Sequence, residues 1–218
     1  MKPKKKQFLV IGLRRFGTSL AKALCEMGHE VLAVDRNADL VADVSPFVTQ
    51  AIQANATDDE VFDSLDAGSY DAAIVAIASN VRDSILISVL CKEAGVPLVL
   101  AKAMDDLHAK VLSKVGVDKV IFPERDMGQR VARSLVMPRM LELMSLTGNS
   151  QVAETLLPVK WENRTLEDIN IRRNYGVTVL AVHRGEETIT ALSADFKLLP
   201  GDTLLMLGTN AAIDAIDQ

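Results

Sequence analysis

The sequence predicts an α/β protein, in which a Rossmann-like, doubly wound parallel sheet is followed by a small α/β module. Three observations favour this fold class. Apolar runs of strand length alternate with helical stretches over the first two thirds of the 218-residue chain. A glycine-rich turn, Gly12 to Gly17, follows the first apolar run and opens the first helical pattern. Around Thr147 to Ser150 the alternation ends, so we expect domains at residues 1–147 and 148–218.

The first domain is expected to alternate strands with helices. The predicted strands are residues 8–11, 31–34, 48–53, 71–77, 97–101 and 117–122. The predicted helices between them are residues 16–27, 37–43, 81–94 and 105–115. Because nearly unbroken apolar strands are typical of a parallel sheet covered on both faces, we expect helices on both sides of it.

Residues 126–146 are expected to form one long helix or a kinked pair, because apolar side chains recur along them and Pro138 interrupts the middle. Several of these apolar residues are methionines, which suit an adaptable contact surface. The segment therefore has two interpretations. It is either a crossover helix that docks on a neighbouring subunit or a terminal helix packed on its own sheet.

The second domain is expected to hold short strands and two short helices. The predicted strands are residues 152–159, 177–182, 188–192 and 203–207. The predicted helices are residues 165–171, with Thr165 as N-cap, and residues 210–216. A module of this size is too small to house a large substrate pocket alone.

Composition excludes some classes of protein. The net charge of −5 argues against a general nucleic-acid binder, and the basic residues 2–6 are expected to form a solvated terminus. No apolar stretch approaches the roughly 18 residues that span a bilayer, and no signal-peptide pattern precedes the first strand. We therefore expect a cytoplasmic protein. Cys25 and Cys91 lie in amphipathic helical patterns and are expected to be buried free thiols.

The turn from Gly12 to Gly17 predicts a nucleotide-binding site. In a dinucleotide fingerprint the first glycine makes the turn, and the last lets helix and strand pack closely. Asp35 ends the second predicted strand, where an acid binds the ribose hydroxyls and disfavours a 2′-phosphate. Arg14 replaces the middle glycine, and it either adds a phosphate contact or blocks the approach of a pyrophosphate to the backbone.

Four other charged residues belong to the same hypothesis. Arg15 lies within the loop, where it can reach the far phosphates of a nucleotide. Arg36 either stacks on adenine or faces solvent, and Lys102 is either a phosphate partner or a surface charge. Glu124 is either an acid that favours the start of a helix or a ligand for a hard cation that bridges phosphates.

Residues after the third and fourth predicted strands are expected to line the same crevice, because ligands bind at the carboxyl ends of parallel strands. The set predicted for the nucleotide is Gly12, Arg14, Arg15, Phe16, Gly17, Asp35, Arg36, Asn55, Ala56, Thr57, Ala78 and Lys102. No Ser-His-Asp, paired-carboxylate or Cys/His constellation stands out in the sequence. This absence argues against an enzyme, because a dehydrogenase needs a substrate-binding domain with a proton-transfer residue near the nicotinamide.

Several short segments, in order and spacing, resemble one known family. They are Val10 to Gly17, Met27 to Asp35, Asn55 to Thr57, Lys102-Ala103, Pro123 to Gly128, Tyr175-Gly176 and Leu199 to Leu204. Over nearly the whole chain they resemble the regulatory RCK subunits of bacterial potassium uptake systems of the Ktr/Trk type. Arg14 is the departure, since the pattern of the family has glycine there.

The resemblance implies a fold, ligands and partners. It implies an RCK N-terminal domain with a crossover helix and an RCK C-terminal domain. It also implies dimers that assemble into an octameric cytosolic ring, on the inner face of the membrane, which binds ATP or ADP and gates a potassium channel subunit. Arg15 would then reach the ATP γ-phosphate across a subunit interface, and Glu124 would help to bind Mg²⁺, Ca²⁺ or Na⁺.

The C-terminal module resembles a domain that binds cyclic di-AMP at a dimer interface. The residues in the matching segment are Leu166, Ile169, Ile171, Arg172 and Asn174. Two alternatives to an ATP/ADP regulator stay open, namely a Trk-type regulator that binds NAD(H) and a small NAD-dependent oxidoreductase. An NAD-sensing transcription regulator would need a DNA-binding helix-turn-helix and a basic face, and the sequence shows neither.

Overall fold

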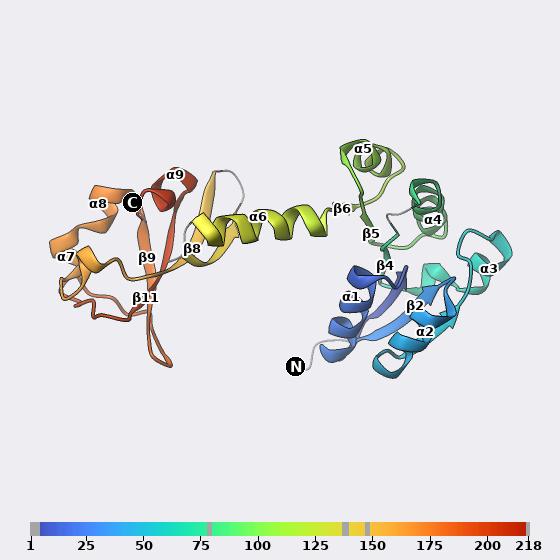
Figure 1. Ribbon diagram of the computed structural model, residues 1–218, viewed down its shortest axis with the longest axis horizontal. Coiled ribbons are helices and arrows are strands. Elements are labelled where there is room, and N and C mark those ends of the chain that lie inside the picture. The colour runs from blue at the N-terminus through green and yellow to red at the C-terminus, as the bar shows by residue number, and fades with distance from the viewer. Residues whose placement is uncertain (1–4, 78–79, 137–139, 147–148, 217–218) are drawn as a thin grey trace. The chain divides into compact units, whose positions relative to one another are not determined.

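The computed structural model describes the chain apart from residues 1–4, 78–79, 137–139, 147–148 and 217–218 (Figure 1). Internal contacts divide the chain into two compact units, Met1–Asp126 and Met127–Gln218. The division falls inside helix α6 (Pro123–Val136). The domain boundary predicted after residue 147 lies beyond strand β7 (Met140–Ser145), which is part of the sheet of the second unit.

The first unit contains a six-stranded parallel sheet with the order β3-β2-β1-β4-β5-β6. Its strands are β1 (Gln7–Ile11), β2 (Glu30–Asp35), β3 (Gln50–Gln53), β4 (Ala72–Val75), β5 (Val99–Lys102) and β6 (Lys119–Ile121). Ile11 of β1 pairs with Val34 of β2 on one side and with Val75 of β4 on the other. The strand order reverses between β1 and β4, which is the arrangement of doubly wound dinucleotide-binding folds. The predicted fold class is confirmed.

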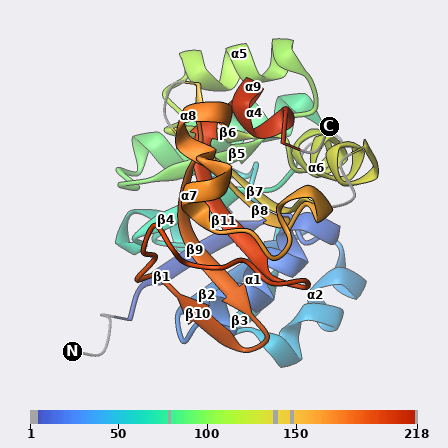
Figure 2. The ribbon, with the colours of Figure 1, turned by 90° about the vertical axis from the view of Figure 1, so that its left-hand side faces the viewer.

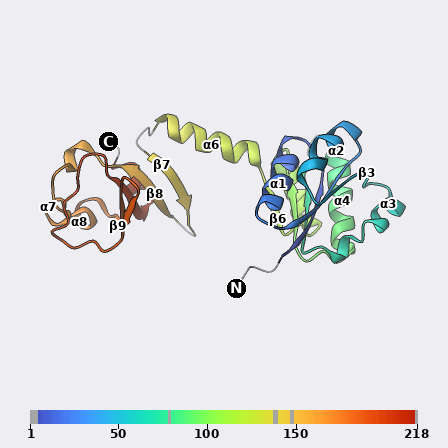
Figure 3. The ribbon, with the colours of Figure 1, turned by 90° about the horizontal axis from the view of Figure 1, so that it is seen from below.

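Helices cover both faces of this sheet, as Figure 3 lets the reader follow. They are α1 (Arg15–Glu26), α2 (Ala38–Val44), α3 (Asp59–Ser64), α4 (Val81–Glu93) and α5 (Asp106–Lys114), with short 3-10 turns at Ser45–Phe47 and Ala67–Ser69. Successive side chains of β1 point to opposite faces. Val10 packs in one buried cluster with residues of α1 and α2, and Leu9 and Ile11 pack in another with residues of α3, α4 and α5.

Helix α3 is an element that the sequence analysis missed. Its N-cap, Asp58, accepts hydrogen bonds from the backbone N–H groups of Glu60 and Val61, and its residue Phe62 is buried. An aspartate cap followed by acids in the first turn is a start signal, but the helix is too short to show periodicity. Among the described helices, none combines the length and the apolar character that a bilayer crossing requires.

The long helix predicted for residues 126–146 is wrong in its second half. Helix α6 ends at Val136, and Met140–Ser145 is strand β7, which pairs antiparallel with β8 (Ser150–Leu156). A short apolar stretch fits a helix or a strand equally well by periodicity, and pairing with β8 decides in favour of the strand. Pro138, the predicted kink, lies outside the described residues.

The second unit is built on a five-stranded antiparallel sheet with the order β10-β9-β11-β8-β7 (Figure 2). The remaining elements are β9 (Thr178–Arg184), β10 (Glu187–Ile189), β11 (Thr203–Thr209), a 3-10 turn at Val159–Trp161, α7 (Leu166–Ile169), α8 (Ile171–Tyr175) and α9 (Asn210–Asp214). Trp161, Leu204 and Met206 lie in its core. The N-cap predicted at Thr165 is confirmed, because its hydroxyl accepts a hydrogen bond from the N–H of Asp168.

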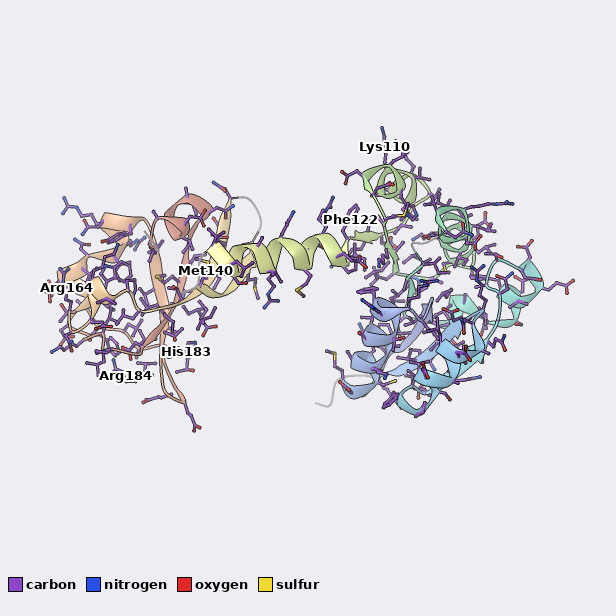
Figure 4. The ribbon with its side chains drawn as sticks, in the orientation of Figure 1. Lys110, Phe122, Met140, Arg164, His183 and Arg184 are labelled. Atoms are coloured by element: carbon purple, nitrogen blue, oxygen red, sulfur yellow. The ribbon has the colours of Figure 1, made fainter. Side chains whose placement is uncertain are left out.

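A buried ion pair fixes one turn of the second unit. The Asp202 side chain is 1% exposed and accepts hydrogen bonds from Nε and Nη2 of Arg184, each at 2.8 Å. It also accepts the N–H of Leu199 at 2.8 Å. Burial acts to raise the pKa of the Asp202 carboxyl, but the bonds from Arg184 and Leu199 outweigh it and hold the pKa below its usual value. Figure 4 labels Arg184 and its neighbour His183.

The two cysteines are free thiols, as predicted. Cys91 is buried in the first unit, and burial raises the pKa of its thiol to about 12, so it packs as an apolar side chain. Cys25 is only half-buried, and its Sγ lies 3.9 Å from the hydroxyl of Thr49. The prediction of burial is therefore wrong for Cys25.

Candidate nucleotide-binding site

A cavity of about 200 Å³ lies at the carboxyl ends of strands β1, β2 and β4. This is the point where the strand order of the sheet reverses, and ligands of doubly wound proteins bind at such points. The residues that line it are Ile11, Gly12, Arg14, Val34, Asp35, Arg36, Asn37, Leu40, Ala54, Asn55, Ala56, Thr57, Ala76, Ile77, Asn80, Asp83 and Ile87.

The two glycines of the loop are required by space and by backbone conformation. Gly12 has φ +99°, and a Cβ there would lie 2.8 Å from Cγ1 of Ile77. A Cβ on Gly17 would lie 1.8 Å from the carbonyl oxygen of Gly12, which is far inside van der Waals contact. The loop and the first turn of α1 therefore pack as closely as a phosphate-binding turn requires.

Asp35 ties the end of β2 to this loop. One oxygen of its carboxylate accepts the N–H of Leu13 at 2.7 Å, and the other accepts the N–H of Asn37 at 2.9 Å. Each carboxylate oxygen can accept two hydrogen bonds, so one acceptor position stays free on each of them within the part of the chain described. Both oxygens are thus available to hydroxyl groups of a ribose in the cavity.

Arg14 occupies the position of the missing glycine without backbone strain. It is the N-cap residue of α1 with φ −72° and ψ −176°, an extended conformation that any residue adopts. Its side chain is exposed and lines the cavity. Among the described residues, no side chain caps the N-terminus of α1, so the first N–H groups of that helix are open to an anion.

Arg15 and Phe16, also predicted for the site, do not line the cavity. Arg15 is the exposed first residue of α1. Phe16 is half-buried and packs against the apolar cluster that contains Val10 and Leu13. Within one chain, Phe16 is therefore a packing residue, and Arg15 is an exposed residue outside the cavity lining.

The far end of the cavity is formed by residues that follow β2 and β3. Asn55 accepts hydrogen bonds from both the N–H and the hydroxyl of Thr57, at 3.4 and 2.9 Å. Arg36 lies 3.8 Å from Asp83 of α4, measured between Nη1 and Oδ2. Ala78, the last residue predicted on this edge, lies outside the described residues.

Lys102 and Glu124 form an ion pair with each other and do not line the cavity. The Lys102 side chain is 15% exposed, whereas that of Glu124 is 72% exposed. The hydrogen bond from Lys102, followed by one from the backbone, lowers the pKa of the Glu124 carboxyl. No cluster of three or more His, Cys, Asp or Glu side chains suited to a metal ion occurs in the described part of the chain. Glu124 therefore belongs to no such cluster within the described residues.

Comparison with known proteins identifies the family. The sequence matches the TrkA-N domain over residues 8–123 and the TrkA-C domain over residues 155–218. It is 37% identical over 214 residues to Ktr system potassium uptake protein C of Bacillus subtilis, covering 98% of this chain and 97% of that protein. It is 42% identical over 208 residues to Ktr system potassium uptake protein A of Vibrio alginolyticus, with 95% and 94% covered. The chain belongs to the Ktr/Trk family of RCK subunits.

The fold of this RCK subunit is also found among solved structures. The crystal structure of the GsuK RCK domain superimposes with a TM-score of 0.66 at 18% identity, covering 99% of this chain. The chain spans about half of that protein, since the match covers 47% of it. At this level of identity the likeness shows the shared fold.

Of the five residues predicted to contact cyclic di-AMP, only Arg172 and Asn174 are exposed on the RCK subunit's second unit. Ile169 and Ile171 are buried, at 3% and 4% exposure, and Leu166 packs against the same core. Asn174 donates a hydrogen bond from Nδ2 to the carbonyl oxygen of Ile169 at 2.7 Å. The three apolar residues therefore belong to the hydrophobic core of the second unit or pack against it.

Several residues that line the cavity were missed by the sequence analysis. They are Asn37, Leu40, Asp83 and Ile87, whereas Asn80 lies among the residues expected there after the fourth predicted strand. Asn37 and Asn80 cap α2 and α4, each with a side-chain oxygen that accepts N–H groups of the first turn. An asparagine just after a predicted strand and at the start of a predicted helix is a signal that would have found Asn37.

Proposed function

We propose that this RCK subunit is a cytosolic, non-enzymatic regulator that gates potassium uptake in response to bound ATP or ADP. The observation that carries the proposal is the cavity at the carboxyl ends of β1, β2 and β4, with the close packing at Gly12 and Gly17 and the free acceptor positions of Asp35. The relatives support potassium uptake, because two of them at 37% and 42% identity are named Ktr system potassium uptake proteins.

Charge supports a nucleotide with several phosphates. Asp35 holds the ribose, while the uncapped N-terminus of α1 receives the phosphates, with Arg14 beside them in the cavity lining. A ligand shifts an equilibrium between two conformations only by its different affinity for them. The γ-phosphate that distinguishes ATP from ADP supplies this difference, through Arg15 of a neighbouring subunit and a cation held with the help of Glu124.

Assembly completes the proposal. Dimers form an octameric ring on the inner face of the membrane, and the ring contacts a membrane potassium channel subunit of the Ktr/Trk type. Arg15 is exposed on the first turn of α1, where it is free to reach the cavity of another copy. Cyclic di-AMP binds at a dimer interface of the second unit, where Arg172 and Asn174 are the exposed residues.

The test combines binding with transport. Isothermal calorimetry on the purified chain is expected to show ATP and ADP binding, and potassium flux in vesicles with a Ktr-type membrane subunit is expected to differ between the two nucleotides. The same measurements are made on Arg14→Gly, which restores the glycine. Flux that ignores nucleotide in both proteins would disprove the proposal. Binding of NADH in place of ATP and ADP would favour the NAD(H)-binding regulator, and hydride transfer to small carbonyl substrates would favour the oxidoreductase.

A further inference from the structure

The lining of the cavity includes an ion pair, formed by Arg36 and Asp83, that is separate from the glycine turn. Arg36 follows directly after β2, and Asp83 lies in the first turn of α4. Their side chains approach to 3.8 Å, and both residues line the cavity. The pair therefore connects two elements that are far apart in the sequence and that both contribute to the cavity lining.

The two consecutive residues Asp35 and Arg36, at the end of β2, point their side chains to opposite faces of the sheet and make different contacts. Asp35 reaches the glycine loop through the N–H of Leu13, whereas Arg36 reaches α4. A nucleotide whose ribose lies at Asp35 and whose phosphates lie at the glycine loop directs its base away from that loop. The base then lies at the end where Arg36 and Asp83 meet.

Asp83 differs from other acids in first turns of helices. Asp106 in the first turn of α5 is also paired with an arginine, Arg125, at 2.8 Å, but its side chain is 88% exposed and does not line the cavity. The Asp83 side chain is only 23% exposed. An acid that merely favours the start of a helix has no need to be turned into a cavity.

The backbone of Arg36 is held by a hydrogen bond, whereas its side chain is largely exposed. Its carbonyl oxygen accepts a hydrogen bond from Nε2 of Gln53 at 3.2 Å, while its side chain is 70% exposed. A guanidinium held at one edge by a carboxylate keeps its flat face available, and such a face stacks on aromatic rings. A base in the cavity is an aromatic ring of this kind.

We propose that Asp83 is a positioning residue for the base, because it holds the guanidinium of Arg36 over the cavity, where that guanidinium stacks on the base of a bound nucleotide. This inference rests on the proposed nucleotide site and adds a second function to it. The glycine loop reads the phosphates, and the Arg36–Asp83 pair fixes the base.

The first test measures affinity by calorimetry with ATP, ADP and inorganic tripolyphosphate as probes. For Asp83→Asn, we expect ATP and ADP affinities to fall by the same factor, about two- to fivefold, the range of an exposed ion pair. Tripolyphosphate, which has no base, is expected to bind as before. Asp83→Glu keeps the carboxylate and is expected to retain most of the affinity. Asp106→Asn is the matched control and is expected to change none of these values.

The second test asks whether Asp83 acts through Arg36. Arg36→Leu is expected to weaken ATP and ADP equally, and adding Asp83→Asn to it is expected to cause no further loss. Fully additive losses would overturn the inference, as would a changed ratio of ATP to ADP affinity or an equal loss for tripolyphosphate. The melting temperature without nucleotide is expected to stay unchanged, and a large drop would mean that Asp83 acts through stability alone.

The outcome separates this inference from the proposed function. If the unaltered protein binds NAD⁺ and neither ATP nor ADP, the proposed function fails, and the same variants are then measured with NAD⁺, which carries the same adenosine half. Equal losses there would still support the role of Asp83. If the unaltered protein binds none of these nucleotides, both proposals are wrong.

Discussion

Asp35 in the first unit and Asp202 in the second both organise a loop, but they differ in what their carboxylates have left to offer. Asp202 accepts two bonds from Arg184 and one from Leu199, and its side chain is 1% exposed. Within the ranges that the structure describes, Asp35 accepts two backbone N–H groups, and it lines a cavity. Asp202 has three of its four acceptor positions filled and is closed to a ligand by burial, whereas Asp35 has two positions free beside a cavity. The comparison teaches that unused acceptor capacity at a cavity separates a binding residue from a structural one.

The largest effect is expected from Gly17→Ala, which attacks the loop that Asp35 organises. The added Cβ would meet the carbonyl oxygen of Gly12 at 1.8 Å, so the backbone must move, and we expect the first unit to lose about 3 kcal/mol of stability or more. Urea unfolding followed by circular dichroism measures this loss. The only tryptophan, Trp161, lies in the core of the second unit, so its fluorescence transition is expected to stay in place.

Gly128→Ala is the control for that prediction. Gly128 lies in helix α6, and none of the described residues comes within 4 Å of a Cβ placed there. Alanine in a helix is more stable than glycine by about 1 kcal/mol, so this variant is expected to gain stability slightly. A loss for Gly128→Ala as large as that for Gly17→Ala would show that the close packing of the loop is not the cause.

Asp202→Asn is expected to cost about 2 kcal/mol in the second unit and nothing in nucleotide affinity. The variant removes the charge that faces Arg184, and the guanidinium keeps partial access to water, which makes the loss smaller than for a fully buried pair. Urea unfolding followed by Trp161 fluorescence measures it. Glu186→Gln, an exposed acid in the turn between β9 and β10, is the matched control.

The pH profile of the same variant sharpens the comparison. The folded-state pKa of Asp202 lies below its unfolded value, so its stabilisation is fully present above the unfolded pKa of about 3.9 and is lost as the pH falls through the lower folded value. In the unaltered protein, the urea concentration at the unfolding midpoint of the second unit is therefore expected to decrease as the pH is lowered below about 4. For Asp202→Asn we expect a flatter profile over that window. If the midpoint changed equally with pH in both proteins, the loss of stability in acid could not be assigned to Asp202.

Asp35→Asn is expected to lower nucleotide affinity more than stability, the reverse of Asp202→Asn. The amide keeps one oxygen acceptor and loses the charge, so the loop loses about 1 kcal/mol of stability. The affinity for ATP and ADP is expected to fall about tenfold, because bonds from ribose hydroxyls to a charged acceptor are the stronger ones. Calorimetry gives the affinity and circular dichroism gives the stability. A variant that unfolds readily and yet binds normally would place Asp35 with Asp202 as a structural residue.

The sequence predicted the parts of this molecule that depend on local pattern. Apolar runs placed the strands of the parallel sheet, and the spacing from Gly12 and Gly17 to Asp35 placed the cavity. It did not predict β7, because pairing with β8 is a contact made outside the local pattern. It also missed α3, which is too short for its periodicity to be read.

The same distinction applies to the site. Asp83 enters the cavity only because α4 is packed against the sheet end that also carries Arg36, and no spacing in the sequence reports that contact. The ion pair between Lys102 and Glu124 is likewise formed between the end of β5 and the start of α6. Residue types near strand ends identify candidates, and tertiary packing decides which of them meet.

The smallest effect is expected from Arg14→Gly, and its sign decides what the arginine does. The Arg14 backbone is extended, so glycine relieves no strain there, and the stability of the first unit is expected to stay nearly unchanged. Removing the side chain gives a pyrophosphate a closer approach to the backbone N–H groups at the start of α1, but it also removes a positive charge from the cavity. We expect access to outweigh charge, so that ATP and ADP bind about threefold more tightly, as calorimetry measures. Weaker binding, with a shallower salt dependence, would instead make Arg14 a phosphate ligand and place it with Asp35 among the residues whose capacity is kept for the nucleotide.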